Sequence, residues 1–143
     1  MPNRAGKTEL GENHRRAVSV LIRGTERACD GVLEWIERPS SMMTEVRDDL
    51  SAKEKVQLRE LASGLKSEIR SFLEVFPLDK SAASRRRSIA AIISAACIDL
   101  EEVVDSGLKG YGPQPPDARE ALNQGLTEMI KILEQMLPIA ERG

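Results

Sequence analysis

The residue with the clearest potential for chemistry is His14, because it is the single histidine in the sequence. A histidine exposed on a helix can accept a phosphoryl group and pass it on, since its imidazole titrates near neutral pH. Arg15 follows His14, whereas an acidic residue usually follows a histidine of this kind. We therefore expect an exposed side chain without a special role, with phosphotransfer at His14 as an alternative.

A second group is acidic, and Asp99, Glu101, Glu102 and Asp105 all lie within one predicted helix. Spacings of three and four residues place them in pairs on common helix faces, and carboxylate oxygens are the ligands that Mg²⁺ prefers. A Mg²⁺-dependent hydrolase would need a second acidic cluster on a neighbouring helix. The last predicted helix has only widely spaced glutamates, so we expect a solvated acidic face, with the hydrolase as an alternative.

Three consecutive arginines, Arg85, Arg86 and Arg87, lie near the amino end of the same predicted helix. The helix dipole favours anions at that end and cations at the other, so both charge clusters are reversed. Neighbouring antiparallel helices could supply opposite charges to each cluster, and we expect such pairs within the domain. The alternatives are a phosphate-binding patch for RNA at Arg85–Arg87 and an antiparallel homodimer through this helix.

The remaining residue types point away from metal and cofactor chemistry. Cys29 and Cys97 stand among apolar residues of two predicted helices, which is typical of buried, reduced thiols. One histidine and two scattered cysteines do not make a zinc site, and no glycine-rich phosphate loop occurs. The sequence therefore predicts no catalytic residues, no metal and no cofactor.

The charge and hydropathy of the whole chain limit its partners. With 21 Lys+Arg and 23 Asp+Glu, the formal net charge of −2 builds in no long-range attraction to nucleic acid or anionic lipid. The longest nearly uninterrupted apolar stretch, Ile89 to Ile98, is about half a membrane span. The polar residues 1–10 do not form a signal peptide. We expect a cytoplasmic protein without a membrane partner.

Helices must position these residues, because apolar side chains recur at steps of three and four along most of the chain. We predict an all-α protein, an antiparallel up-down four-helix bundle, with a short extra helical turn or loop at residues 40–50 between the first two helices. Residues 1–11 are predicted to be a flexible tail, and residues 12–143 a single domain of 132 or so residues, about the usual size.

Local signals predict where the helices begin and end. Pro39 and Pro77 should end the first two helices. Ser51, followed by Glu54 at the capping-box spacing, should begin the second. Asp117 is predicted to cap the fourth helix, and Pro138 to end or kink it.

Each predicted helix carries a seam of apolar residues that should pack between helices. The principal seam residues are Val18, Ile22, Cys29, Val32 and Ile36; Leu58, Leu61, Leu65, Ile69, Phe72 and Phe76; Ile89, Ile93, Ala96, Leu100 and Val103; and Leu122, Leu126, Met129, Leu133 and Met136. A second stripe on the first helix has small residues at Gly24, Ala28 and Gly31, which predicts close approach of a neighbouring helix.

Trp35, Met42, Met43 and Tyr111 should lie at one end of an up-down bundle. Methionines adapt to varied partners and aromatic residues anchor them, so these residues are a candidate interaction surface. The alternative, which we favour, is that they cap the end of the core. The leading hypothesis is a non-enzymatic helical interaction or adaptor module that self-associates or binds a protein partner. RNA binding through Arg85–Arg87 is the first alternative, and the two enzymatic readings are the second.

Short segments of the last two predicted helices resemble the small four-helix proteins encoded within ribosomal RNA intervening sequences. They are Ser94-Ala95-Ala96, Leu100-Glu101, Gly110-Tyr111 and Glu128 to Leu133. The resemblance covers less than half of the chain, so we name no family from it. It implies oligomerisation and nucleic-acid binding through a basic surface, whereas this chain is net acidic.

Overall fold

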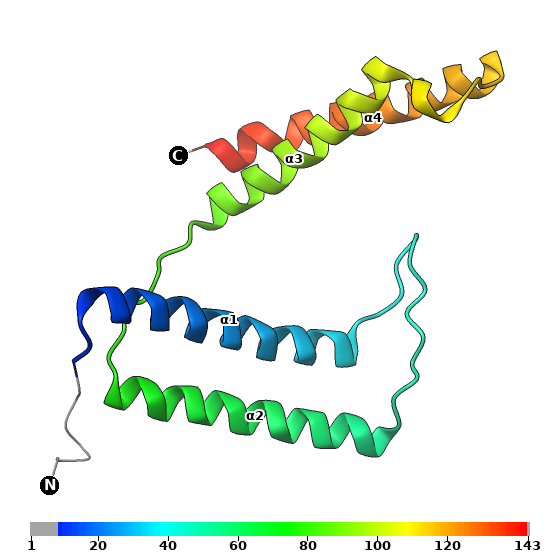
Figure 1. Ribbon diagram of the computed structural model, residues 1–143. Helices are drawn as coiled ribbons and strands as arrows, with labels where there is room; N and C mark the ends of the chain where they lie inside the picture. Colours follow the sequence, from blue (N-terminus) through cyan, green and yellow to red (C-terminus); the bar gives the residue numbers. More distant parts are fainter. Residues whose placement is uncertain (1–8, 143) are drawn as a thin grey trace, which may run out of the picture. The chain divides into compact units, whose positions relative to one another are not determined.

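The computed structural model describes residues 9–142 of the 143-residue chain, and this part is all-α (Figure 1). It contains the helices α1 (Glu12–Glu37), α2 (Ala52–Val75), α3 (Arg85–Ser106) and α4 (Pro116–Glu141), and a short 3₁₀ turn, η1 (Lys109–Tyr111). No strand occurs in residues 9–142. The predicted fold class is confirmed, and of the predicted tail only residues 9–11 are described, just before α1.

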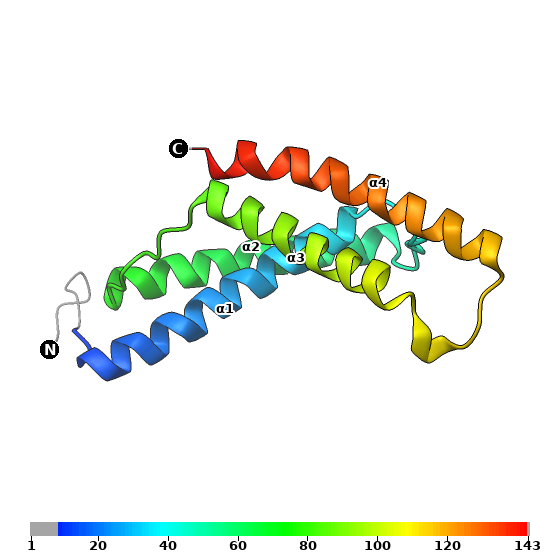
Figure 2. The same cartoon turned by 90° about the horizontal axis from the view of Figure 1, so that it is seen from above.

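The chain divides into two compact units, one up to Lys80 and the other from Ser81 onward. In the first unit α1 packs against α2, and in the second α3 packs against α4. Each unit is a hairpin of two antiparallel helices (Figures 1 and 2).

The capping box predicted at the start of α2 is confirmed. The hydroxyl of Ser51 accepts a hydrogen bond from the backbone N–H of Glu54 at 3.0 Å, and the Ser51 N–H donates to Oε1 of Glu54 at 2.9 Å. Because these bonds satisfy N–H groups that an isolated helix end leaves free, α2 begins at a defined residue.

The α1–α2 hairpin has a narrow core that follows part of the predicted seams. Cys29 is its most buried residue, at 2% exposure, and Ile36, Ala62 and Ile69 are also buried. The Cys29 thiol donates to the backbone carbonyl of Ala62 at 3.3 Å, which places the middle of α1 against α2. Other seam residues stay largely exposed, Leu61 among them.

The α3–α4 hairpin has a core of Ile93, Cys97 and Ala140, against which Leu133 and Leu137 pack. Burial, and then the nearby carboxylates of Glu101 and Glu134, raises the pKa of the Cys97 thiol above its ordinary value. Gly107 ends α3 in the left-handed conformation (φ +61°), which glycine adopts without strain.

The structure tests two local predictions for α4, the cap at Asp117 and the end of the helix at Pro138. Asp117 does not cap α4; the N-cap position is Pro115 with Pro116 as the first helical residue, because a proline has no N–H to leave unsatisfied there. Pro138 does not end the helix, which continues to Glu141. A proline this close to the carboxyl end interrupts only the last turn, so few backbone bonds are lost.

The small-residue stripe of α1 is not closely packed. A Cβ atom added at Gly24 or at Gly31 would meet no heavy atom within 4 Å. The segment 40–50 is a loop without a helical turn. None of the helices in residues 9–142 is both long and apolar enough to cross a membrane.

Candidate interaction surface of the α1–α2 hairpin

The loop between α1 and α2, residues 38–51, is held by its own hydrogen bonds. The N–H of Ser41 donates to the carbonyl of Thr44 at 2.8 Å, and the N–H of Thr44 donates back to the Ser41 hydroxyl at 3.1 Å. The Ser40 hydroxyl accepts from the N–H of Val46 at 2.9 Å. These bonds close a tight turn whose tip carries Met42 and Met43, both fully exposed.

The returning half of this loop is fixed to α2. Nζ of Lys55 lies 2.7 Å from Oδ2 of Asp48, and Lys55 is partly buried. The loop therefore runs out past the end of α1, turns at the two methionines and comes back across the end of the hairpin (Figure 1).

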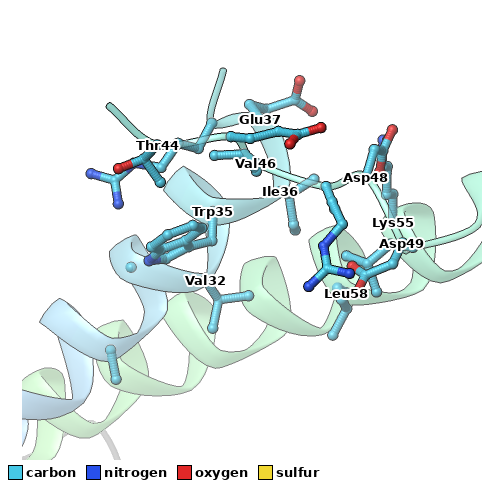
Figure 3. A pocket seen from close by; sticks show the side chains of 16 residues that line it. Val32, Trp35, Ile36, Glu37, Thr44, Val46, Asp48, Asp49, Lys55 and Leu58 are labelled. Atoms are coloured by element: carbon cyan, nitrogen blue, oxygen red, sulfur yellow. The ribbon is translucent and has the colours of Figure 1, made fainter. Parts of the chain in front are cut away.

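A hollow of about 1010 Å³ lies between the end of α1, the returning loop and the start of α2. In Figure 3 the side chains of Val32 and Trp35 from α1, Val46 from the loop and Leu58 from α2 surround it, with Asp48, Asp49 and Lys55 at its edge. Its wall thus combines apolar side chains with charged ones, an arrangement that suits a partner carrying both kinds of group.

Trp35 is the largest side chain of this hollow, and it is exposed. The guanidinium of Arg38 lies 4.3 Å from the centroid of its ring, and Arg38 also pairs with Glu34 at 2.8 Å. A cation held over an indole ring is attracted to the face of the ring, and this attraction restricts the orientation of the ring. Trp35 is therefore an exposed apolar surface with a restricted orientation, as anchors of interfaces usually are.

The predicted surface residues do not all meet. Trp35 lines the hollow, whereas Met42 and Met43 stand at the loop tip and do not line it. Tyr111 belongs to the other unit, where it is exposed in η1. The sequence pattern did not place Val46 and Lys55 in this surface, because the returning loop and the packing of α1 against α2 bring them to the hollow.

The arginine cluster has a structural role at one of its three positions. Nη1 of Arg86 donates to the backbone carbonyl of Ile139 at 2.8 Å, near the carboxyl end of α4. A cation is favourable there, since the carbonyls of a helix end carry partial negative charge. Arg85 and Arg87 are exposed. The ion pairs expected between this cluster and acidic side chains of neighbouring helices are not found in residues 9–142, and Arg86 contacts α4 through a backbone carbonyl instead.

The remaining candidates are exposed residues of the two hairpins. His14 is exposed in the first turn of α1. Asp99, Glu101, Glu102 and Asp105 are exposed along α3. Within residues 9–142 no three His, Cys, Asp or Glu side chains come close enough together to hold a metal ion.

Comparisons with protein-family models, with curated proteins and with solved structures give no match to this chain. The resemblance of the segments in α3 and α4 to proteins of ribosomal RNA intervening sequences gains no support from them.

Proposed function

We propose that the chain is a non-enzymatic helical interaction module that self-associates. The observation that carries the proposal is the number of large apolar side chains left exposed along the helices. Each hairpin contributes several, among them Leu21, Val32, Trp35, Leu61 and Leu65 in the first and Ile89, Ile92, Met129, Ile132 and Met136 in the second.

These side chains supply a driving force for association. Full burial of one Leu, Ile or Met contributes about 1.5–3 kcal/mol relative to exposure. Soluble monomers seldom leave a contiguous apolar patch of more than a few hundred Å² open to water. A protein–protein contact that buried these side chains would therefore be favourable, and it would require no catalytic group.

Size-exclusion chromatography with light scattering tests this proposal. We expect a mass above that of the 15.8 kDa chain, with a share of the larger species that rises with concentration. A measured molecular mass equal to that of a single chain at every concentration would overturn self-association.

RNA binding through Arg85 and Arg87 is the second candidate, because Arg86 is engaged with α4 while its two neighbours are free to reach phosphates. A filter-binding titration at several salt concentrations separates the two functions. Phosphate contacts predict an affinity that falls steeply with salt, and a slope near zero would rule out this mode.

We also propose the cytoplasm as the place of action. Cys29 and Cys97 are both buried and unpaired in a disulfide, which suits a reducing compartment. Labelling with a thiol reagent in intact cells and after lysis and denaturation would test it, since both cysteines should react as free thiols.

A further inference from the structure

The two sides of the α1–α2 hairpin differ in chemistry. Ion pairs connect the helices on one side, between Oδ1 of Asp30 and Nζ of Lys66 at 2.8 Å and between Glu37 and Arg59. The attraction of Asp30 raises the pKa of the Lys66 ammonium above its ordinary value. This polar side is satisfied by contacts within the hairpin.

The opposite side is apolar, as the helical positions show. With Cys29 facing α2, a rotation of about 100° per residue puts Asp30 and Glu37 on one side of α1. The same rotation puts Leu21, Val32 and Trp35 about 60–120° to the other side.

The same division holds on α2. With Ala62 facing α1, Arg59 and Lys66 lie on one side. Leu58, Leu61 and Leu65 lie on the other side, where Glu54 and Glu68 flank them at the two ends. In two antiparallel helices that face each other, residues rotated in the same sense from the line of contact point to the same side of the pair. The apolar residues of both helices therefore share one side, which we call the apolar face: Leu21, Ala28, Val32, Trp35, Leu58, Leu61 and Leu65.

Most of this face is open to water, since Leu21 is 67% and Leu61 71% exposed. Helices of 26 and 24 residues are about 36–39 Å long, and two of them side by side present a strip about 20 Å wide. This whole side of the hairpin thus measures about 750 Å², close to the roughly 800 Å² that each partner contributes to a stable protein interface. The apolar face is its central part, since Leu21 to Trp35 spans about 21 Å of α1.

The pattern along α1 is symmetric about Ala28. Leu21 and Trp35 stand seven residues before and after Ala28, and small residues lie between them at Gly24 and Gly31. Added Cβ atoms at these glycines meet nothing within 4 Å, so the middle of the stripe is a shallow depression between two large side chains. A surface with this symmetry is complementary to itself after a two-fold rotation.

We propose that the apolar face is the contact between two copies of this chain, with the two α1 helices antiparallel and crossing near Ala28. Leu21 then lies against the partner's Trp35, and the small residues let the helix backbones approach closely. The inference rests on the proposed self-association and names the surface that produces it.

Two matched substitutions test the surface by light scattering and by analytical ultracentrifugation. Leu21→Glu places a charge in the apolar face, whereas Val20→Glu places it nine residues from Cys29, on the back of α1, at a nearly equal exposure of 62%. We expect Leu21→Glu to weaken dimerisation at least 100-fold and Val20→Glu to change it less than threefold. Both sites are exposed, and circular dichroism verifies that both variants stay helical.

A disulfide trap gives a direct reading of the crossing point. In a chain with Cys29→Ala and Cys97→Ala, Ala28→Cys should form an interchain disulfide under mild oxidation, because a crossing near this residue brings the two Cα atoms within about 7 Å. Val20→Cys in the same background should stay unlinked.

The outcomes separate the inference from the function it rests on. A wild-type chain that is monomeric overturns both. A wild-type dimer that keeps its affinity in Leu21→Glu but dissociates in Ile132→Glu overturns the apolar face as the contact and leaves self-association standing. A dimer that both substitutions dissociate shows contact between unlike hairpins and also overturns the inference.

Discussion

The two hairpins hold their helices together through different contacts. In α1–α2, ion pairs bridge the helices on one side and a hydrogen-bonded loop crosses the end, where it leaves a hollow beside Trp35. In α3–α4 the connection is shorter, residues 107–115, with Gly107 and Leu108 both in the left-handed conformation, and Arg86 connects the start of α3 to the end of α4. The longer loop of α1–α2 forms the hollow together with both helices.

The largest effect should come from a buried isoleucine in each hairpin. Ile93→Ala should reduce the free energy of unfolding of α3–α4 by about 2–5 kcal/mol, because Ile93 is only 3% exposed and its loss leaves a cavity. Ile69→Ala should do the same to α1–α2. Hydrogen exchange resolved by segment measures each hairpin separately.

The control for this comparison is Ile98→Ala on the exposed surface of α3, which should change stability by less than about 0.5 kcal/mol. Equal loss of protection in both hairpins after Ile93→Ala would show that they unfold as one cooperative unit, and the comparison of separate hairpins would then fail.

Helix capping should give the next largest effect. Ser51→Ala should cost about 1–2 kcal/mol and Ser84→Ala about 1 kcal/mol, because Ser51 takes part in a reciprocal box with Glu54 whereas Ser84 only accepts from the N–H of Arg87, at 3.2 Å. Thermal unfolding of both variants measures the difference. A larger loss at Ser84 would contradict this ranking.

A smaller effect separates the two roles within the arginine cluster. Arg86→Ala should reduce stability by about 0.3–1 kcal/mol, since the carbonyl of Ile139 loses its charged donor. Arg85→Ala should leave stability unchanged, so any loss of RNA binding in that variant would come from the phosphate contact alone. Urea unfolding and filter binding of both variants give the two readings.

The smallest effect is a dependence on pH. Hydrogen bonds from the backbone N–H and the side chain of Ser51 lower the pKa of Glu54 below its ordinary value of 4.5. Because the folded pKa is the lower one, the stabilisation is complete above about pH 4.5 and is lost as the pH falls through the folded pKa. Glu54→Gln should remove this component, and unfolding of both forms between pH 6 and 2.5 or so, about the range where carboxylates titrate, measures it.

Some details were predictable because they depend on neighbours in sequence. The Ser51–Glu54 box was confirmed, since its two hydrogen bonds join residues three apart. For the segment 40–50 the sequence is compatible with either a helical turn or a loop, because Met42, Val46 and Leu50 fit a helical spacing. The hydroxyls of Ser40 and Ser41 hold it as a loop, and such local bonds compete with helix formation.

The amino-acid sequence by itself determined that this protein is helical and approximately where each helix runs, because periodicity, caps and prolines act within a few residues. Only the tertiary structure decided which seam residues are covered. Cys29 and Ile93 are buried while Leu21 and Leu61 are exposed, although all four are apolar residues at helical spacing. Burial depends on which neighbouring helix a side chain meets, and that is a property of packing between distant segments.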